Sequence, residues 1–499
     1  MKNKKITVIL VAFVLGSSLC TFGTETTKAE TDGNLDAVVL LSDNLANEKV
    51  KEVIDENGGE VLDEIPQIGE IHVKGSSRLL LELKETEGVE SLASNLTVKL
   101  KEEESDYWKP STNGYWNGND SENSWWKGDD SNSYWGDNSF TPNDKPEDKP
   151  IEKPSEEEMK RFVLDEKQWD IKRVTENGKS YELGTGNHDV VVGIIDSGVD
   201  IDHKDLTENF LGGENFVPEN YLGDDTEVGD KDDIDDRFGH GTNVTGFIAA
   251  NGEMKGIAPN IGYRSYRIFD TYGNTDFFIC ADAVTKAVDD GVKVINLSIA
   301  SFYIDGSYIY TDPYTGEIED LGNNKEDYEV IKRAIDYALS HDVVVVTSSG
   351  NDGADCSDGG KLAEYFNAID TDGFTYLGNM YQLLGSINGV ITVSSTTADD
   401  ELAYYSNYGK GLIDIAAPGG DYNKECFSTS NNGRYKNVAG TSFSAPKVSA
   451  AAALILCQDG SLTPKDVEKR LYDSADKIYG EESKSYFGNG ILNVFKALK

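Results

Sequence analysis

Ser442 is the first residue whose surroundings suggest chemistry. It lies among small residues in NVAGTSFSAP (437–446), directly before the apolar run KVSAAAALILC. A serine at a helix start can act as a cap, because its hydroxyl accepts a hydrogen bond from an unpaired backbone N–H. A serine that attacks a carbonyl group needs instead a base to take its proton and a third group to orient that base. The rest of the chain decides between these roles.

One of the five histidines has the surroundings that such a base requires. His240 lies between two glycines in RFGHGTNVTGFIAA, where a turn opens into a helix. Glycine allows the backbone and a substrate to approach closely. The other four lie in an N-terminal unit, before a strand, in a polar turn and in a helix-to-strand connection: His72, His188, His203 and His341. A lone histidine at a turn is more often structural, so the assignment of His240 depends on its partners.

An aspartate and an asparagine at the ends of two apolar segments complete the set. Asp196 ends VVVGIID, where an unpaired buried charge would be costly. Its carboxylate is held either by the following Ser-Gly turn alone or also by a histidine, whose tautomer it would then fix. Asn351 follows VVVVTSSG and is either a turn residue or a side-chain donor to an oxyanion. Together with Ser442 and His240, these residues could perform acyl transfer through a serine nucleophile.

Strands and helices alternate from about residue 162 to residue 499. VVVGIID and HDVVVVTSSGN predict buried strands, whereas ADAVTKAVDDG, YEVIKRAIDYALS and SAPKVSAAAALILC predict helices. This alternation predicts an α/β fold with a parallel sheet and helices on both faces. Since ligands bind beyond the carboxyl ends of such strands, the sheet would bring the candidate residues together.

The order Asp, His, Ser, with the motifs DSG, GHGT and GTSFSAP and an asparagine at a strand end between the last two, resembles the subtilisin-like serine peptidases (subtilases). The resemblance covers residues 165–499 and implies the subtilisin-like fold. It implies that Asp196, His240 and Ser442 form the catalytic triad. The Asn351 side chain and the Ser442 backbone N–H would form the oxyanion hole. The substrate-binding residues that the resemblance implies are Ser298, Ile299, Ala300, Gly350 and Asp352.

Three segments resemble a narrower group, the lantibiotic leader peptidases, which are secreted subtilases that remove the leader from a thioether-bridged precursor. They are QWDIKRVT, NLSIAS with the Tyr-rich acidic insertion after it, and APKVSA. Ala300 and Ser301 replace the usual Gly-Gly pair of the family, which implies a narrower groove and a restricted substrate. Asp352 implies a preference for a basic or small polar residue before the cut. The alternatives are a broad-specificity secreted degradative subtilase and a cell-wall- or peptide-binding protein.

The chain before the catalytic unit divides into three zones. Lysines ahead of an apolar run predict a secretory signal peptide over residues 1–29, so we expect an extracellular protein without a stable membrane anchor. Residues 32–100 alternate short strand and helix patterns and resemble the subtilase propeptide, which inhibits the enzyme until it is removed. Residues 101–164 are acidic and rich in Trp and Tyr, with a composition typical of a disordered linker. A maturation cut is expected between Leu100 and Asp165.

Charge and loop length limit the partners and cofactors. The formal net charge of −43 argues against nucleic acid, which requires a basic surface. We expect a peptide or protein substrate, the chain's own propeptide as inhibitor, and no cofactor for catalysis. Asp205 matches an acidic ligand of the family's calcium site, but the short loop NGEMKG implies that this site is lost or weakened. The run DDTEVGDKDDIDD (224–236) lacks a calcium-ligand spacing and predicts a solvated acidic loop.

Of the five cysteines, one lies in the predicted signal peptide. Cys280 and Cys457 lie in apolar helical patterns and are predicted to be small buried hydrophobic residues. Cys356 and Cys426 lie in polar segments and could pair in an oxidising exterior. The sequence leaves their connectivity open.

Overall fold

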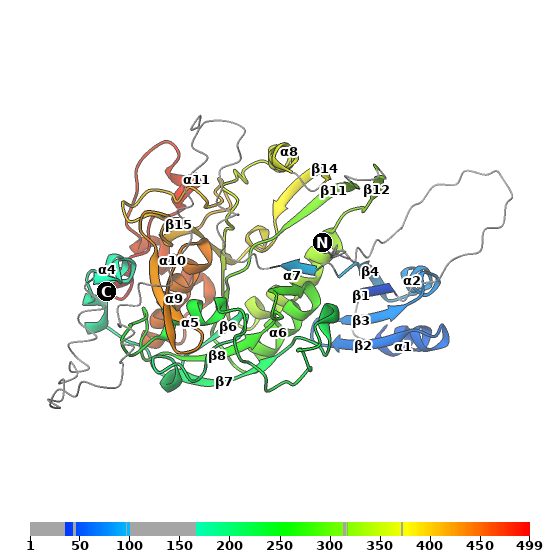
Figure 1. The fold of residues 1–499 in the computed structure, drawn as a ribbon, viewed down its shortest axis with the longest axis horizontal. Helices are drawn as coiled ribbons and strands as arrows, with labels where there is room; N and C mark the ends of the chain where they lie inside the picture. The colour runs from blue at the N-terminus through cyan, green and yellow to red at the C-terminus, as the bar shows by residue number, and fades with distance from the viewer. Residues whose placement is uncertain are drawn as a thin grey trace, which may run out of the picture.

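The computed structural model describes residues 35–42, 46–95, 97–99, 166–312, 316, 318–370 and 373–499 (Figure 1). The predicted signal peptide and the predicted linker lie outside these ranges. Within the ranges, no helix is long and apolar enough to cross a membrane.

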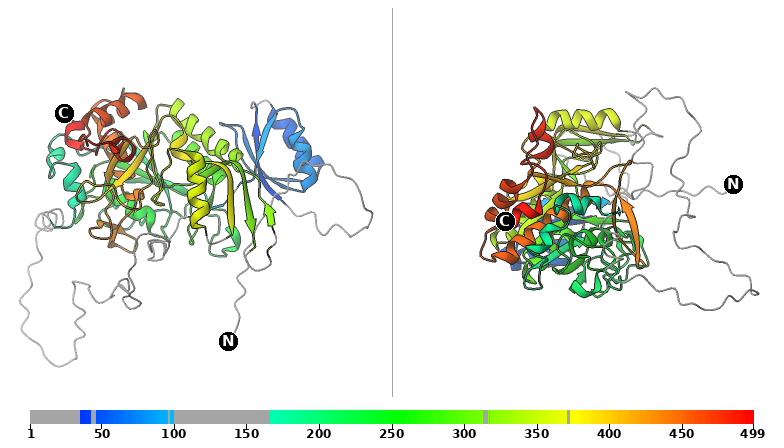
Figure 2. Two further views of the ribbon diagram at one scale, coloured as in Figure 1. Left: turned by 90° about the horizontal axis from the view of Figure 1, so that it is seen from above. Right: turned by 90° about the vertical axis from the view of Figure 1, so that its left-hand side faces the viewer.

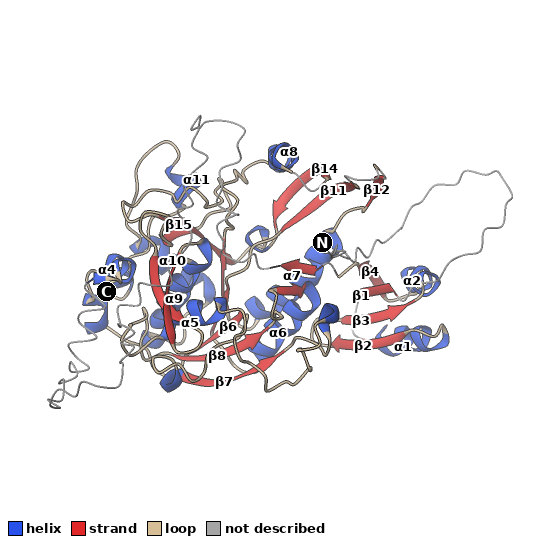
Figure 3. Cartoon of the chain, in the orientation of Figure 1, coloured by secondary structure: helices blue, strands red, loops and turns tan. Residues whose placement is uncertain are grey.

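A seven-stranded parallel sheet lies at the centre of the C-terminal unit (Figure 3). In chain order its strands are β6 (Val191–Asp196), β7 (Phe210–Asn215), β8 (Gly262–Arg267), β10 (Val294–Leu297), β13 (Val344–Ser348), β15 (Val390–Thr396) and β16 (Ile415–Pro418). Their order across the sheet is β16-β15-β13-β10-β6-β8-β7. The predicted parallel α/β fold is therefore confirmed.

Four helices cover the two faces of this sheet. They are α5 (His240–Ala249), α6 (Phe277–Asp289), α7 (Lys325–Ser340) and α9 (Ala445–Gln458). Helices α5 and α9 share one core with the sheet, and α6 and α7 share the other. Along β6, Ile194 points into the first core and its neighbour Ile195 into the second. Burial on both faces explains why the strands are continuous apolar runs in the sequence.

The N-terminal unit is a small α+β structure that packs against α6 and α7 (Figure 2). Its elements are β1 (Leu35–Leu41), α1 (Asn47–Glu56), β2 (Glu60–Ile65), β3 (Glu70–Gly75), α2 (Ser77–Lys84) and β4 (Val89–Ala93). The strands form an antiparallel sheet in the order β2-β3-β1-β4, with α1 and α2 on one face. Val38, Leu40 and Ile65 on the other face join the core that contains α6 and α7.

A short strand connects this unit to the catalytic unit. Strand β5 (Thr97–Lys99) pairs antiparallel with β9 (Asn274–Asp276), with Thr97 opposite Asp276 and Lys99 opposite Asn274. Strand β9 leads directly into α6. Its last residue, Asp276, caps the helix, because its side chain accepts a hydrogen bond from the Ile279 N–H. The pairing therefore places the end of the N-terminal unit beside the start of α6.

The Tyr-rich insertion forms a second, three-stranded antiparallel sheet. Its strands are β11 (Phe302–Thr311), β12 (Ile318–Asp320) and β14 (Phe374–Gln382), in the order β12-β11-β14. Helix α8 (Gly359–Ile369) packs on this sheet, where Ile304, Leu362 and Met380 form a small separate core. Strand β11 begins directly after Ser301, so the sheet extends from the predicted substrate-binding segment.

The remaining elements are distributed over several cores. They are α4 (Trp169–Val174), β17 (Cys426–Ser430), β18 (Arg434–Val438), α10 (Pro464–Ser474), α11 (Ser483–Phe487), α12 (Val494–Ala497), and the short 3-10 turns η2 (Lys179–Glu182), η3 (Thr207–Asn209), η4 (Tyr221–Gly223), η5 (Leu384–Ser386) and η6 (Thr441–Phe443). Residues of α4, α10 and α12 pack into the same core as α9. Turns η4 and η5 lie beside the core that contains α6 and α7, and α11 lies in a small cluster of its own.

Candidate active site

Asp196 and His240 form a direct pair at the carboxyl end of β6. The Nδ1 atom of His240 lies 2.7 Å from Oδ1 of Asp196, and the two residues are 8% and 1% exposed. The Ser197 N–H donates to the same oxygen at 2.8 Å. The two roles considered for Asp196 therefore coexist, since the carboxylate is held by the turn and also contacts the imidazole. This contact orients the ring and leaves Nε2 as the atom that can exchange a proton.

Asp236 fixes the start of the helix that carries His240. Its Oδ1 accepts hydrogen bonds from the Gly239 N–H (2.6 Å) and the Ser197 hydroxyl (2.8 Å). Its Oδ2 accepts from the Thr242 N–H (2.8 Å) and hydroxyl (2.6 Å). Burial raises the pKa of the Asp236 carboxyl, and these hydrogen bonds counteract the rise. One carboxylate thus ties the turn after Asp196 to the first turn of α5.

The sequence did not identify Asp236, because it ends an acidic run that predicts a solvated loop. That prediction is wrong for part of the run, since Asp224, Glu227 and Asp236 are each less than a tenth exposed. Glu227 forms an ion pair with the fully buried Arg267. The useful signal was the position of Asp236 three residues before a glycine that opens a helix, which matches a carboxylate that binds backbone N–H groups.

Ser442 lies in η6, one residue after Thr441 and directly before α9. Its hydroxyl donates to the Ser298 carbonyl oxygen at 3.3 Å, and the Ser298 hydroxyl donates to the Ser442 carbonyl oxygen at 2.8 Å. The ring of the next residue, Phe443, lies 5.5 Å from the His240 ring between centroids. The structure therefore brings Ser442 beside the predicted substrate-binding segment and its turn against the imidazole.

Asn351 is oriented by the residues just before Ser442. Its Oδ1 accepts hydrogen bonds from the Thr441 N–H (2.9 Å) and hydroxyl (2.8 Å). The amide NH₂ is therefore the group that can donate to a substrate oxygen. A Cβ atom built on Gly440 would lie 3.6 Å from this nitrogen. The geometry suits an oxyanion donor better than a simple turn residue.

Gly350, which precedes Asn351, occupies a position that requires glycine. Its φ of +100° is unfavourable for other residues, and a Cβ atom there would lie 2.5 Å from the Asn407 side-chain nitrogen. The Gly350 N–H donates to the Thr441 hydroxyl at 3.2 Å. Gly350 is thus part of the support for the turn that carries Ser442.

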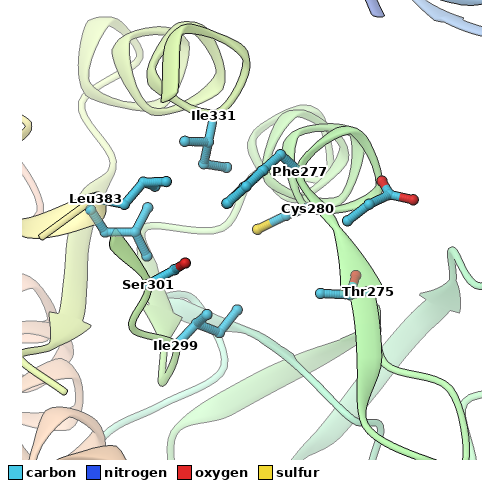
Figure 4. Close-up of a pocket in the computed structure, with 9 residues that line it drawn as sticks. Thr275, Phe277, Cys280, Ile299, Ser301, Ile331 and Leu383 are labelled. Carbon is cyan, nitrogen blue, oxygen red and sulfur yellow. The ribbon is translucent and has the colours of Figure 1, made fainter. Parts of the chain in front are cut away.

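Ser298, Ile299 and Ala300 follow β10 as an extended segment at the edge of the site. The Thr347 hydroxyl donates to the Leu297 and Ile299 carbonyl oxygens at 3.1 and 3.0 Å, which fixes the path of the segment. Ile299 lines an apolar pocket (Figure 4). The other residues around this pocket are Thr275, Asp276, Phe277, Cys280, Ser301, Ile331, Leu383 and Leu384. The pocket is small, with a volume of about 10 Å³, which is close to the room for one water molecule.

Asp352 is held by Asn407 and by the inserted sheet's helix α8. Its carboxylate accepts from Asn407 Nδ2 at 2.9 Å, and its N–H donates to Asn407 Oδ1 at 2.9 Å. The Tyr365 hydroxyl of α8 donates to its carbonyl oxygen at 2.7 Å. A single amide side chain thereby fixes both the backbone and the carboxylate of Asp352, and its effect on specificity stays a prediction.

Asp205 is surrounded by protein donors. Its carboxylate accepts hydrogen bonds from the Glu253 N–H (3.0 Å), the Met254 N–H (2.8 Å) and the Tyr435 hydroxyl (2.8 Å). The short loop approaches so closely that a Cβ atom on Gly252 would lie 1.7 Å from Asp205 Oδ1. These residues do not fit a calcium site. Across the described ranges, no group of three His, Cys, Asp or Glu side chains could hold a metal ion.

A buried ion pair links α4 to the helix that follows Ser442. Lys447 Nζ lies 2.9 Å from Asp170 Oδ2, and both side chains are fully buried. The same ammonium group donates to the carbonyl oxygens of Phe443 (2.8 Å) and Pro418 (3.0 Å). It also lies 3.8 Å from the centroid of the Phe247 ring. Asp170 and Lys447 belong to QWDIKRVT and APKVSA, so two segments noted separately in the sequence meet here.

The cysteines in the described part of the chain are free thiols. The pairing of Cys356 with Cys426 that the sequence left open is therefore not present in this structure. Cys426 begins β17 instead of lying in a polar loop, and its sulfur lies 3.9 Å from Lys447 Nζ in the buried cluster. Burial raises the pKa of the Cys356 and Cys426 thiols, which keeps both in the unreactive protonated form.

Comparisons with known proteins agree with this geometry. The family model described as Peptidase_S8, Subtilase family, matches residues 187–490. The chain is 32% identical to the epidermin leader peptide-processing serine protease EpiP of Staphylococcus epidermidis, over 67% of this chain and 75% of that protein. It is also 32% identical to the nisin leader peptide-processing serine protease NisP of Lactococcus lactis subsp. lactis, over 66% of this chain and 48% of that protein.

Solved structures give the same result. The crystal structure of EpiP from Staphylococcus aureus superposes with a TM-score of 0.70 at 26% identity, covering 93% of this chain and 98% of that one. The crystal structure of NisP from Lactococcus lactis superposes with a TM-score of 0.58 at 31% identity, covering 66% and 93%. The chain belongs to the subtilase family and is a serine endopeptidase.

Proposed function

We propose that this protein is a secreted endopeptidase that removes the leader from a lantibiotic precursor. The observation that carries the proposal is the assembly of the Asp196–His240 pair, Ser442 and Asn351 beside the extended segment 298–300. The relatives named above process the epidermin and nisin leader peptides, and one of them matches two thirds of this chain. A serine endopeptidase with those relatives is best explained as a leader peptidase.

The reaction follows from the position of each group. The Ser442 hydroxyl attacks the scissile carbonyl carbon while His240 Nε2 takes its proton, and Asp196 stabilises the resulting imidazolium. The Asn351 NH₂ group and the Ser442 N–H donate to the oxyanion that forms. His240 then gives the proton to the leaving amine, which departs as the product with the new N-terminus. Water, deprotonated by His240, hydrolyses the acyl-enzyme and releases the leader.

The substrate is proposed to bind as an extended strand along segment 298–300. The apolar residues around Ile299 would contact an apolar side chain upstream of the cut. The methyl group of Ala300 stands where the family usually has glycine, which narrows the groove. Asp352 is proposed to favour a basic or small polar residue directly before the cut, because its carboxylate attracts donors.

Residues 32–100 are proposed to act as an inhibitory propeptide that is removed by the enzyme itself. The support is the pairing of β5 with β9, because Thr275 and Asp276 of β9 also line the pocket beside Ile299. A strand in this place would block the approach of a substrate strand. The cut is placed between Leu100 and Asp165, and the catalytic unit is proposed to need no calcium.

The function is tested with secreted wild-type protein and the Ser442→Ala variant, each incubated with a candidate lantibiotic precursor and with casein. Mass spectrometry of the products identifies every cleaved bond. We expect a single cut at the end of the leader and little digestion of casein, both absent from the variant. Extensive casein digestion without leader removal would instead identify a degradative subtilase. Normal processing of the propeptide in Ser442→Ala expressed alone would disprove self-cleavage.

A further inference from the structure

Asp327, in the first turn of α7, binds the segment of the N-terminal unit that leads into β5. Its Oδ2 accepts a hydrogen bond from the Ser94 hydroxyl at 3.0 Å, and its Oδ1 accepts one from the Asn95 N–H at 2.9 Å. The Asp327 residue is fully buried under this segment. A carboxylate with two such donors forms charge-assisted hydrogen bonds, which are stronger than neutral ones.

This contact is continuous with the place where a substrate strand would lie. Thr97, two residues after Asn95, pairs with Asp276 of β9. Ile331, one helical turn after Asp327, lines the apolar pocket beside Ile299. The Asn95 side-chain oxygen also accepts from the Phe278 N–H of α6 at 3.3 Å. A chain that enters the groove in the direction of β5 therefore has to pass Asp327 first.

We propose that Asp327 is a substrate-recognition residue of the mature enzyme. Its carboxylate binds a backbone N–H and a Ser or Thr hydroxyl of the leader, at the positions that Asn95 and Ser94 hold relative to β5. This inference rests on the proposed leader-peptidase function and adds to it that the enzyme reads the leader upstream of the residues in the groove. The ligand is a peptide with a hydroxyl three residues before its groove-binding strand, followed by a residue such as Asn or Gly that adopts the left-handed backbone of Asn95.

Arg333, six residues after Asp327 on α7, provides the contrast that makes the proposal specific. Its guanidinium donates to the carbonyl oxygens of Leu41 (2.9 Å), Ile68 (3.2 Å) and Gly69 (3.2 Å). These carbonyls come from separate parts of a folded sheet, so a linear peptide cannot present them together. Arg333 is therefore specific for the folded N-terminal unit, whereas the Ser94 and Asn95 groups that bind Asp327 come from two consecutive residues of one chain, of which Asn95 has a left-handed backbone with a φ of 51°.

The test uses the full chain after maturation and two chromogenic peptides. The long peptide carries the residues of segment 94–99, SNLTVK, and the short one carries only TVK. Both end in the same residue before the chromophore, the one that the enzyme cleaves best. Asp327→Asn is expected to raise KM for the long peptide about tenfold, the value of one hydrogen bond to a charged group, with kcat unchanged. The short peptide is expected to show no change.

Two controls separate recognition from folding. Asp336→Asn changes an exposed acid on the same helix that pairs only locally with Lys332, and it is expected to leave both peptides unaffected. Replacing the serine in the long peptide by alanine tests the same hydrogen bond with an unaltered enzyme. That peptide is expected to bind wild type more weakly and to be less sensitive to Asp327→Asn. Arg333→Ala is expected to speed release of the N-terminal unit without changing KM for either peptide.

The proposal is overturned if Asp327→Asn affects the long and short peptides equally or affects neither. It is also overturned if the serine-to-alanine peptide is cleaved as well as the long peptide. The leader-peptidase function is judged separately, by cleavage of the precursor. If the enzyme does not process the precursor but Asp327→Asn still raises KM for the long peptide alone, the leader-peptidase function is rejected and the recognition site is retained.

Discussion

Replacement of Asp170 by asparagine leaves Lys447 as a buried charge without its counter-ion. The side chains of both residues are fully buried, and the ammonium group lies 2.9 Å from the carboxylate. Asparagine preserves the shape of the side chain, so the change removes charge with little loss of packing. The variant therefore isolates the electrostatic contribution of the pair.

The expected loss is large because the ammonium group cannot reach water. Removal of one partner of a buried ion pair typically costs about 3–5 kcal/mol, since the remaining charge is uncompensated. Replacement of both partners by apolar residues of similar size is close to neutral or stabilising. We therefore expect Asp170→Asn to be much less stable than the double variant Asp170→Leu, Lys447→Met.

Stability is measured by denaturant unfolding in a Ser442→Ala background, where the proposed self-cleavage does not occur. Lys469→Met is the matched control, because the ion pair of Lys469 with Asp473 is exposed to solvent. An exposed pair contributes about 0–1 kcal/mol, so this variant should stay close to wild type. Activity is measured in parallel in the active background.

The kcat of the double variant shows whether Lys447 also positions the turn that carries Ser442, in addition to stabilising the fold. In the double variant the Phe443 carbonyl, which is next to Ser442, loses the Lys447 donor at 2.8 Å. We expect this variant to recover most of the stability but to keep a lower kcat than wild type. If the free energy of unfolding of Asp170→Asn lies within about 1 kcal/mol of the wild-type value, the reasoning is refuted, because such a loss is typical of an exposed pair.

Four further results are expected. Asn351→Ala should lower kcat about 10²- to 10³-fold with KM nearly unchanged, which is the loss known for the oxyanion asparagine of subtilisin. A rise in KM with kcat unchanged would contradict this role. Asp352→Asn should abolish a preference for Arg-ending over Leu- and Phe-ending chromogenic peptides; equal cleavage of all three by wild type would rule that preference out. Chelation of calcium should not shift the thermal midpoint, because protein donors occupy the Asp205 carboxylate, and a large drop would reveal a metal site. Burial and the nearby Asp63 raise the pKa of Asp282 to about 7 at the interface with the N-terminal unit. Since the proton is taken up on binding, that interface should be tightest at acidic pH and weaken as pH rises toward 7. Size-exclusion chromatography of the matured chain at pH 5 and 7.5 should therefore show more release at the higher pH, and Asp282→Asn should reduce the difference.

The main features of the fold were predictable because burial leaves a simple mark on the sequence. Strands such as β6 and β13 are buried on both faces, so they appear as continuous apolar runs. The residues at their ends, Asp196 and Asn351, then stand out as polar groups in an apolar context. By contrast, most of β2 (Glu60–Ile65) is exposed and its first residues are not buried, so no apolar alternation marked it as a strand.

Contacts between distant segments could not be read from the sequence. Asp236 was hidden because its run contains many acids, and the order of residues does not show which carboxylate turns inward to bind Gly239 and Thr242. The same applies to Asp170 and Lys447, which lie in two conspicuous segments at opposite ends of the catalytic unit. Their pairing depends on how α4 packs under α9, which only the tertiary structure defines.

The Asp170–Lys447 pair also limits where the chain can be cut during maturation. A cut between Leu100 and Asp165 leaves Asp170 in the catalytic unit, where it neutralises Lys447. A cut after Asp170 would release the counter-ion with the N-terminal fragment and leave a buried ammonium group beside the turn of Ser442. Because such a charge costs about 3–5 kcal/mol, the product would be destabilised at the position of its nucleophile. The N-terminus of the purified mature enzyme should therefore lie before Asp170, and an active enzyme that begins after it would show that Lys447 is neutralised in another way.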